Sequence, residues 1–560
     1  MFAKPIQQRT RYQRHWLAAL ALTFSTAFAG LAPTAAVAES YSDLVTLFED
    51  WREFETPPLL NGAPDYTAAR FEKAHTELAT YRDRLNSFDI ADWPIDKQVD
   101  WHILRAEMNG FDFNHRVLKP WVRDPAFYQT IWDYRSDVPA HEGPTHHAIL
   151  ELWSYVFPLS ADEEARMIRE LQVIPPLMRQ AQQNLTGNAR DLWVAGIRNV
   201  RDQGEMIERI RTAAGSEASD EFSKALDEAA AATAALIDWL EEQAPSKNGP
   251  SGIGKADYEW YQQQVHYVPL SFEEEYFLLQ REQDRSWTTL ALEEHSNRKL
   301  PAQNPVNSEA AYDRLVRQTS AKLLSFFDKD DVLQMRDYMP RELTAHLGGY
   351  EEPEERNFFT IVTHYDPRPL LSHFYHWFDL AEISDYPHPS PIRQGPLLYN
   401  IFDSRNEGTA TGVEEMFMHA GAYEDSPRSR ELVWIMLAQR AARGLGSLEA
   451  HANEKTMAEA GTVHVEWTPR EWMSNEPELL QFEQHLYLRQ PGYGTSYVTG
   501  KYLLERLLAQ RTQQTAKAGE DYSLKTFFTE LRDAGSVPIS LVHWQLTGDD
   551  SDIQRIMHAQ

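Results

Sequence analysis

Hydrophobic residues recur three or four positions apart along most of the chain, which is the spacing of an amphipathic helix. Three helix starts carry clear signals: the capping boxes S-A-D-E at 160–163 and S-F-E-E at 271–274, and T-P-R-E at 468–471 with proline at the first helical position. An alanine-rich segment at 220–242 predicts a long packed helix. The pattern therefore predicts a mainly α protein.

The helical pattern changes at two places. Residues 357–364, NFFTIVTH, gather aromatic and β-branched side chains before a proline-rich turn, which predicts a small β element. Residues 243–255, QAPSKNGPSGIGK, predict a loop rich in proline, glycine and serine. We therefore predict an N-terminal helical region at 39–242, a linker loop at 243–255, and a C-terminal helical region at 256–550 that carries the functional site.

The first 38 residues have the order of a secretory signal peptide. A basic segment precedes an apolar run from residue 16 to about residue 31, and Ala36-Val37-Ala38 then supplies the small residues that signal peptidase accepts. We predict cleavage after Ala38 and a periplasmic or secreted mature chain. Polar residues interrupt the run before it reaches the roughly 20 apolar residues of a membrane span. No later stretch is long and apolar enough to cross a bilayer, so we expect no span in the mature chain.

Composition narrows the possible chemistry. The chain has no cysteine, so a thiol nucleophile and a thiolate metal site are excluded, and any metal must bind His, Asp or Glu. A formal net charge of −30 repels nucleic acid, which we do not expect as a partner. The loop G-P-S-G-I-G-K-A at 249–256 lacks the final hydroxyl of a nucleotide-binding loop, and no G-x-S-x-G motif occurs. The oligomeric state stays open.

Candidate metal ligands gather between residues 364 and 497. His373 and His376 are three positions apart and can share one face of a helix that starts after Pro369, while Glu407 and Glu414 are seven apart and can do the same. Two histidines and one later acid can hold zinc with a fourth position left for water. We therefore predict His373, His376 and Glu407 as ligands of zinc or another divalent metal, with Glu414 orienting a ligand. A packed histidine pair is the alternative at this spacing.

Four further stretches carry a resemblance to a known family. They are E-G at 407–408 followed by Glu414, R-A-A-R at 440–443 followed by His451, W-T-P-R-E at 467–471, and Q-P-G-Y-G-T-S-Y-V-T-G-K at 490–501. In this order they resemble motifs of the bacterial domain-of-unknown-function family 885, whose members resemble zinc metallopeptidases of the gluzincin type. I-P-P-L at 174–177 with N-L at 184–185 extends the resemblance to residues 160–545.

The resemblance implies a peptidase-like helical body and roles for three more residues. Tyr497 would donate a hydrogen bond to a developing oxyanion, with packing between helices as the alternative. Arg443 and His451 would lie behind the ligands or bind substrate, with structural ion pairs as the alternative. Small molecules or peptides are the substrates that such a site implies.

The chain departs from the family where the family has H-E-x-x-P-G-H-H. Residues 368–377 read R-P-L-L-S-H-F-Y-H-W, so either Arg368 or Phe374, depending on register, replaces the glutamate that activates water. A second cluster, H-E-G-P-T-H-H at 141–147, offers Glu142 as a substitute base if folding brings it near. The leading hypothesis is an exported metal-dependent hydrolase, peptidase- or amidase-like. The alternatives are a catalytically inactive relative that binds a ligand, and a metal-dependent lyase.

Overall fold

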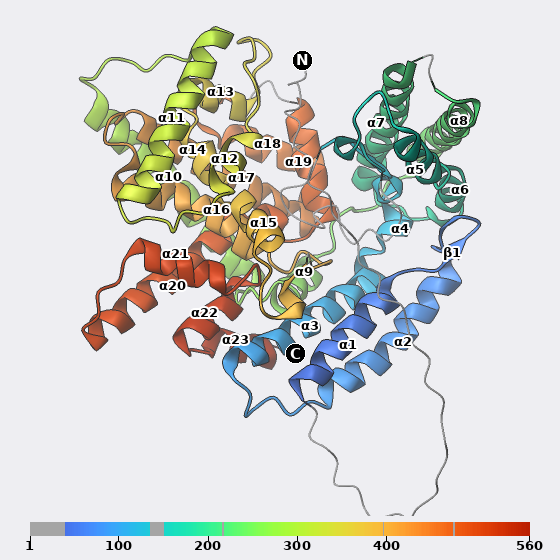
Figure 1. Ribbon diagram of the computed structural model, residues 1–560, viewed down its shortest axis with the longest axis horizontal. Helices are drawn as coiled ribbons and strands as arrows, with labels where there is room; N and C mark the ends of the chain where they lie inside the picture. Colours follow the sequence, from blue (N-terminus) through green and yellow to red (C-terminus); the bar gives the residue numbers. More distant parts are fainter. Residues whose placement is uncertain (1–39, 135–149, 216–217, 396, 474–476, 560) are drawn as a thin grey trace, which may run out of the picture.

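A computed structural model describes residues 40–134, 150–215, 218–395, 397–473 and 477–559 (Figure 1). The described chain is mainly helical, which confirms the predicted fold class. The signal segment and the cluster at 141–147 both lie outside the described residues. Within the described ranges, no helix is both long enough and apolar enough to cross a bilayer.

The first part of the chain forms two groups of helices and two minimal sheets. The first group is α1 (Tyr41–Glu55), α2 (Ala68–Asn86) and α3 (Ile95–Phe113), followed by the short α4 (Pro120–Arg123). The second group is α5 (Ala161–Leu171), α6 (Ile174–Asn184), α7 (Arg190–Ala214) and α8 (Asp220–Gln243). β1 (Leu59–Leu60) pairs antiparallel with β2 (Ala63–Pro64), and β3 (Ile131–Trp132) pairs parallel with β4 (Leu150–Glu151).

The remaining helices form the larger part of the molecule and contain the candidate site. They are α9 (Lys255–Gln264), α10 (Phe272–Asn297), α11 (Glu309–Lys329), α12 (Met339–Ala345), α13 (Phe358–Tyr365), α14 (Arg368–His373), α15 (Tyr375–Asp385), α16 (Asp403–Phe417), α17 (Ser429–His451), α18 (Met457–Glu466), α19 (Pro477–Arg489), α20 (Tyr493–Ala518), α21 (Leu524–Asp533), α22 (Ile539–Thr547) and α23 (Ser551–His558).

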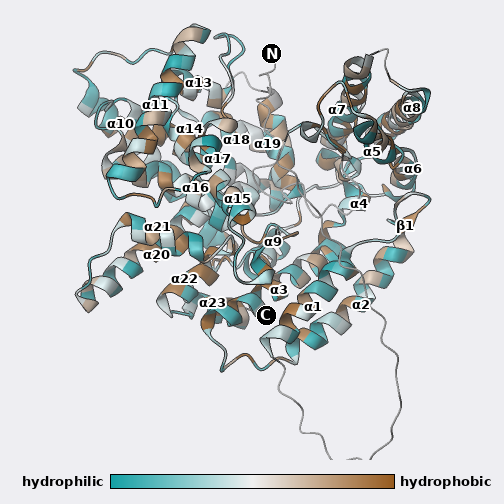
Figure 2. Cartoon of the chain, in the orientation of Figure 1, coloured by the Kyte–Doolittle hydropathy of each residue, from teal (hydrophilic) through white to brown (hydrophobic). Residues whose placement is uncertain are grey.

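The apolar core groups these helices differently from their order in the sequence. Trp51 of α1 and Phe111 of α3 belong to the same buried cluster as Phe527 of α21. Trp193 of α7 and Phe222 of α8 belong to a separate cluster, and α5 to α8 stand together at one side of the molecule in Figure 1. Figure 2 shows teal and brown residues mixed along outer helices such as α1 and α2, as expected for amphipathic helices. Helices α1 and α3 therefore contribute to the core of the C-terminal region, whereas α7 and α8 belong to a core of their own.

Two of the three predicted helix starts form as capping boxes. Ser160 and Ser271 each exchange hydrogen bonds with the glutamate three residues later, at the starts of α5 and α10. Residues 469–471 form only a single 3₁₀ turn, in which Arg470 has a φ of +62°. The Thr468 hydroxyl donates to the His464 carbonyl at 2.7 Å, so it bonds back to the end of α18 and caps no new helix.

The predicted β element at 357–364 is wrong, because these residues form α13. The Asn357 side chain accepts a hydrogen bond from the Thr360 backbone N–H at 3.0 Å and so caps a helix. Phe358 and Val362, four residues apart, are both fully buried on one helix face. β propensity is strongly dependent on context, and here the cap and the buried face outweigh it.

Candidate metal centre

Two helices cross closely and position the acidic side of the site. Gly408 of α16 lies against Gly500 of α20, where a Cβ on Gly408 would lie 2.4 Å from the Gly500 carbonyl carbon and Cα. Only residues without a side chain allow helix backbones to approach this closely. The crossing brings Glu407 beside Tyr493 in the first turn of α20, whose hydroxyl donates to Glu407 Oε1 at 2.7 Å.

The two predicted histidines come from two short helices, whereas the sequence predicted one. α14 ends at His373, and the backbone tightens at Phe374, whose carbonyl accepts from the Trp377 N–H in the first turn of α15. The two imidazole rings still meet, with centroids 5.0 Å apart and planes at 86°. Together with Glu407 they offer three buried ligand atoms that all lie within 4.8 Å of one another. The three predicted ligands are therefore brought together.

Glu414 lies behind His373, two helical turns after Glu407 on α16. Its Oε1 is 3.0 Å from His373 Nδ1, while His373 Nε2 is 3.5 Å from Glu407 Oε2. Arg440 of α17 contacts both carboxylate oxygens of Glu414, at 2.7 and 2.9 Å. Glu414 Oε1 and Arg440 Nη2 therefore both lie against His373 Nδ1, at 3.0 and 3.1 Å, and they hold the ring with Nε2 directed toward Glu407.

The electrostatic balance at His373 is set by opposing neighbours. Burial and the Arg440 guanidinium lower the pKa of His373, whereas hydrogen bonds to Glu407 and Glu414 raise it, and the net shift is upward. Around the imidazoles there are thus two carboxylates, those of Glu407 and Glu414, and one permanent positive charge, that of Arg440. A surplus of negative charge of this kind favours a bound cation.

Tyr497 lies one turn beyond Tyr493 on α20, beside the histidines. Its ring is stacked parallel to that of His373, with centroids 6.1 Å apart and planes at 13°. The Arg443 guanidinium lies 3.9 Å from the Tyr497 ring centroid and donates to Glu483 Oε1 at 2.7 Å. Arg443 therefore supports the phenol ring and is itself neutralised by a buried acid.

His451 lies in a different environment from the cluster. It is fully buried at the end of α17, with Nε2 2.8 Å from the Tyr487 carbonyl and its ring 5.3 Å from that of Tyr258. Burial lowers the pKa of His451 to about 4, so the ring is neutral near pH 7. Its contacts are those of a packed core histidine.

Sequence reasoning missed two contributors to the site, Arg440 and Tyr493. Both stand in the stretches that carry the family resemblance: Arg440 opens R-A-A-R, and Tyr493 follows the proline and glycine at 491–492. Tyr493 also precedes Tyr497 by four positions, which places both on one helix face. That spacing was a usable signal, whereas the bond between Arg440 and Glu414 needed the packing of α16 against α17.

Arg368 and Phe374, the two residues that can stand where the family has its glutamate base, cannot accept a proton from water. Arg368 lies in a buried ion-pair network, in which it contacts Asp366 and Asp425, each at 2.6 Å. Phe374 is a buried apolar residue with 7% of its surface exposed. The side chains at these positions therefore supply no proton acceptor.

The donor set fits a divalent cation. Two imidazoles and one carboxylate are the ligands that zinc takes in catalytic sites with one open position. His373 would bind through Nε2, because Nδ1 faces Glu414. A hydrogen-bonded carboxylate behind a ligating histidine is a common support for bound zinc.

Comparisons with known proteins identify a shared fold. No family model and no curated protein matches the chain, so the resemblance to family 885 stays a prediction. A solved structure from Shewanella oneidensis, described as a "putative lipoprotein of unknown function", has a TM-score of 0.64 and 15% identity, and the match covers 90% of this chain and 99% of that one. A "putative lipoprotein" from Colwellia psychrerythraea has a TM-score of 0.61 and 14% identity, covering 91% and 99%. At this identity the similarity shows the fold alone.

Proposed function

We propose that this chain is an exported metal-dependent hydrolase, peptidase- or amidase-like, that acts on a small or peptide-like substrate. The observation that carries the proposal is the buried cluster of His373, His376 and Glu407, with Glu414 and Tyr493 fixing two of its members. Zinc is the metal that we propose, because this donor set leaves one coordination position for water or substrate.

The proposed roles follow from the contacts of each side chain. A metal held here would supply a Lewis acid that lowers the pKa of water and polarises a carbonyl group. Glu414 holds the His373 ring, and Tyr493 holds the Glu407 carboxylate. Tyr497, whose ring stacks beside that of His373, would donate its phenol hydrogen to negative charge that develops on a substrate oxygen.

Export is supported by two independent features. The first 38 residues have the order of a signal peptide. Both structural neighbours named above are described by the words "putative lipoprotein". A periplasmic or secreted location would also give the site access to peptides and small amides outside the cytoplasm.

A second candidate function is ligand binding without catalysis. It is favoured by the ion-paired Arg368 and the apolar Phe374 at the position where the family has its general base. Loss of a general base commonly lowers a rate by about 10² to 10⁴. A binding protein built on the same helices would tolerate that loss.

Hydrolysis assays on metal-loaded chain separate the two functions. We expect release of amine from a panel of N-acyl amino acids and dipeptides by the zinc-loaded mature chain, and loss of that release in Glu407→Gln. His543→Gln is a matched control, because His543 is another buried histidine and bonds to Gln510 at 2.7 Å. Activity that is absent from the loaded wild type, or unchanged in Glu407→Gln, would rule out the hydrolase.

A further inference from the structure

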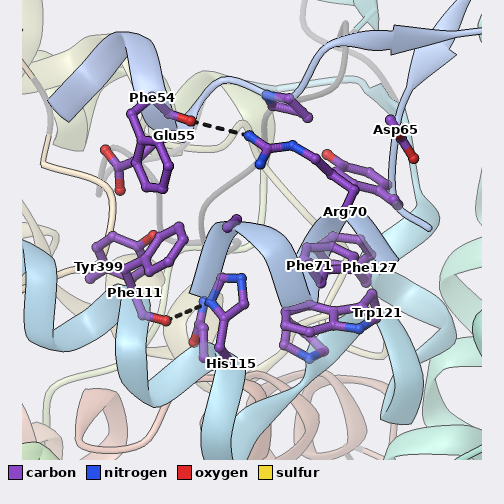
Figure 3. Close-up of a pocket in the computed structure, with 15 residues that line it drawn as sticks. Phe54, Glu55, Asp65, Arg70, Phe71, Phe111, His115, Trp121, Phe127 and Tyr399 are labelled. Carbon is purple, nitrogen blue, oxygen red and sulfur yellow. Dashed lines mark hydrogen bonds between the residues drawn. The ribbon is translucent and has the colours of Figure 1, made fainter. Parts of the chain in front are cut away.

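Two cavities adjoin between the N-terminal helices and the C-terminal region, and both are lined in part by Tyr399. The first is shown in Figure 3 and is lined mainly by aromatic rings, including Phe71, Trp121 and Tyr399. The second has an empty volume of about 630 Å³, including the part open to solvent, and its lining is more polar. Asn400 and Gln490 line the second cavity, together with Arg123, Asp124 and Arg489. The second cavity therefore offers more polar side chains that a ligand could contact.

The side-chain amides of Asn400 and Gln490 form a pair that leaves one donor and one acceptor unused. Asn400 Nδ2 donates to Gln490 Oε1 at 2.7 Å. Among the residues that the structure describes, Asn400 Oδ1 and Gln490 Nε2 have no hydrogen-bond partner, although the two residues are only 4% and 6% exposed. Turning both amides end for end would still leave one donor and one acceptor. The pair is therefore complementary to a group that offers one N–H and one C=O, as a secondary amide does.

The backbone around the pair connects it to the candidate metal centre. The Asn400 carbonyl accepts from the Asp403 N–H at the start of α16, and the Gln490 carbonyl accepts from the Tyr493 N–H at the start of α20. These are the two helices that cross at Gly408 and carry Glu407 and Tyr493. Asn400 also has a φ of +51°, a strained conformation for which asparagine is one of the better residues.

Charge in the cavity favours an anionic ligand. Arg489 Nε lies 2.8 Å from Asp124 Oδ2, so these two charges balance. Arg123 donates to the carbonyl oxygens of Leu118 and Ser251, and it has no carboxylate within 4 Å in the described ranges of the chain. The lining residues therefore carry one surplus positive charge.

We propose that Asn400 and Gln490 form a subsite that binds the amide group of an N-acyl amino acid or short peptide. The ligand N–H would donate to Asn400 Oδ1, and its carbonyl would accept from Gln490 Nε2. The ligand carboxylate would lie toward Arg123. This inference rests on the proposed function only where it treats the bound amide as a substrate.

Calorimetric binding of two matched probes tests the subsite on the full mature chain. N-acetyl-L-alanine carries an amide and a carboxylate, and O-acetyl-L-lactate replaces the amide N–H with an ester oxygen. We expect the ester to bind at least about tenfold more weakly, because Asn400 Oδ1 then faces no donor. Gln490→Glu turns the free donor into an acceptor, so it should weaken N-acetyl-L-alanine by at least about tenfold.

A second Asn–Gln pair in the chain provides the matched control. Asn199 Nδ2 donates to Gln129 Oε1 at 2.9 Å, but Gln129 Nε2 is already bonded to the Ile131 carbonyl. Gln129→Glu should therefore leave binding of the probe unchanged. Gln490→Met, which removes both polar atoms without adding a charge, replaces Gln490→Glu if that variant does not fold.

The outcomes for the subsite and for the hydrolase are distinguishable. Binding measured in His376→Ala reports the subsite without turnover. Amide-selective binding there supports the subsite even if the wild type hydrolyses nothing. Equal affinity for amide and ester, or full affinity in Gln490→Met, overturns the subsite even if the wild type proves to be a hydrolase. Absence of any binding of N-acetyl-L-alanine also overturns it.

Discussion

Gly408→Ala tests whether the close crossing of α16 and α20 holds the site together. The added methyl group would lie 2.4 Å from two backbone atoms of Gly500, which cannot rotate away. That is roughly 1 Å inside ordinary carbon–carbon contact, so the helices must separate. Overpacking of this kind costs about 1–3 kcal/mol, and the higher helix propensity of alanine offsets about 1 kcal/mol. We expect the free energy of unfolding to fall by up to about 2 kcal/mol.

Gly461→Ala is the matched control for this substitution. Gly461 also lies inside a helix, α18, and its added Cβ would meet no atom of another described segment within 4 Å. Its free energy of unfolding should rise by about 0.5–1 kcal/mol. Urea titration followed by circular dichroism measures both variants, and competition with a zinc chelator reports whether Glu407 has moved. If Gly408→Ala and the wild type have equal stability and equal zinc affinity, the close crossing of α16 and α20 does not position Glu407.

Three further substitutions probe the surroundings of the site and the fold. Glu414→Gln should lower zinc affinity by about 10- to 100-fold in chelator competition, because His373 loses its orienting carboxylate; unchanged affinity would contradict that role. Burial lowers the pKa of His451 from 6.5 to about 4, so the unfolded chain binds the proton first as the pH falls. The contribution of His451 to the free energy of unfolding is therefore complete above pH 6.5, and up to about 3 kcal/mol of it is lost as the pH falls toward 4. Urea titrations in acid should show a shallower loss in His451→Gln, and an equal slope would contradict the assignment. Asn357→Ala should cost about 1 kcal/mol in the same urea titration by removing the cap of α13, and no cost would contradict the cap.

The helical class, and the shared face of Glu407 and Glu414 in the candidate metal centre, could be predicted from the sequence because both depend on local patterns. Helical spacing and the capping boxes at Ser160 and Ser271 are read within one turn. The seven-residue separation of Glu407 and Glu414 places both on one face of a helix, and both carboxylates do reach His373. A short-range pattern was sufficient in each case.

The errors arose where tertiary packing decides the local structure. The segment at 357–364 has strand-like residues, yet the burial of Phe358 and Val362 on one face selects a helix. The break at Phe374 follows from local tightening between α14 and α15, which residue spacing does not reveal. The support that Arg440 gives Glu414 joins residues 26 positions apart, so only the assembled helices reveal it.

The most direct test of the proposed metal centre is the metal content of the purified mature chain, measured by mass spectrometry after dialysis against zinc. We predict one zinc ion per chain in the wild type and in His543→Gln, and little or none in His376→Ala and Glu407→Gln. A wild type that holds no zinc, or equal zinc content in all four proteins, would contradict a metal centre built from His373, His376 and Glu407.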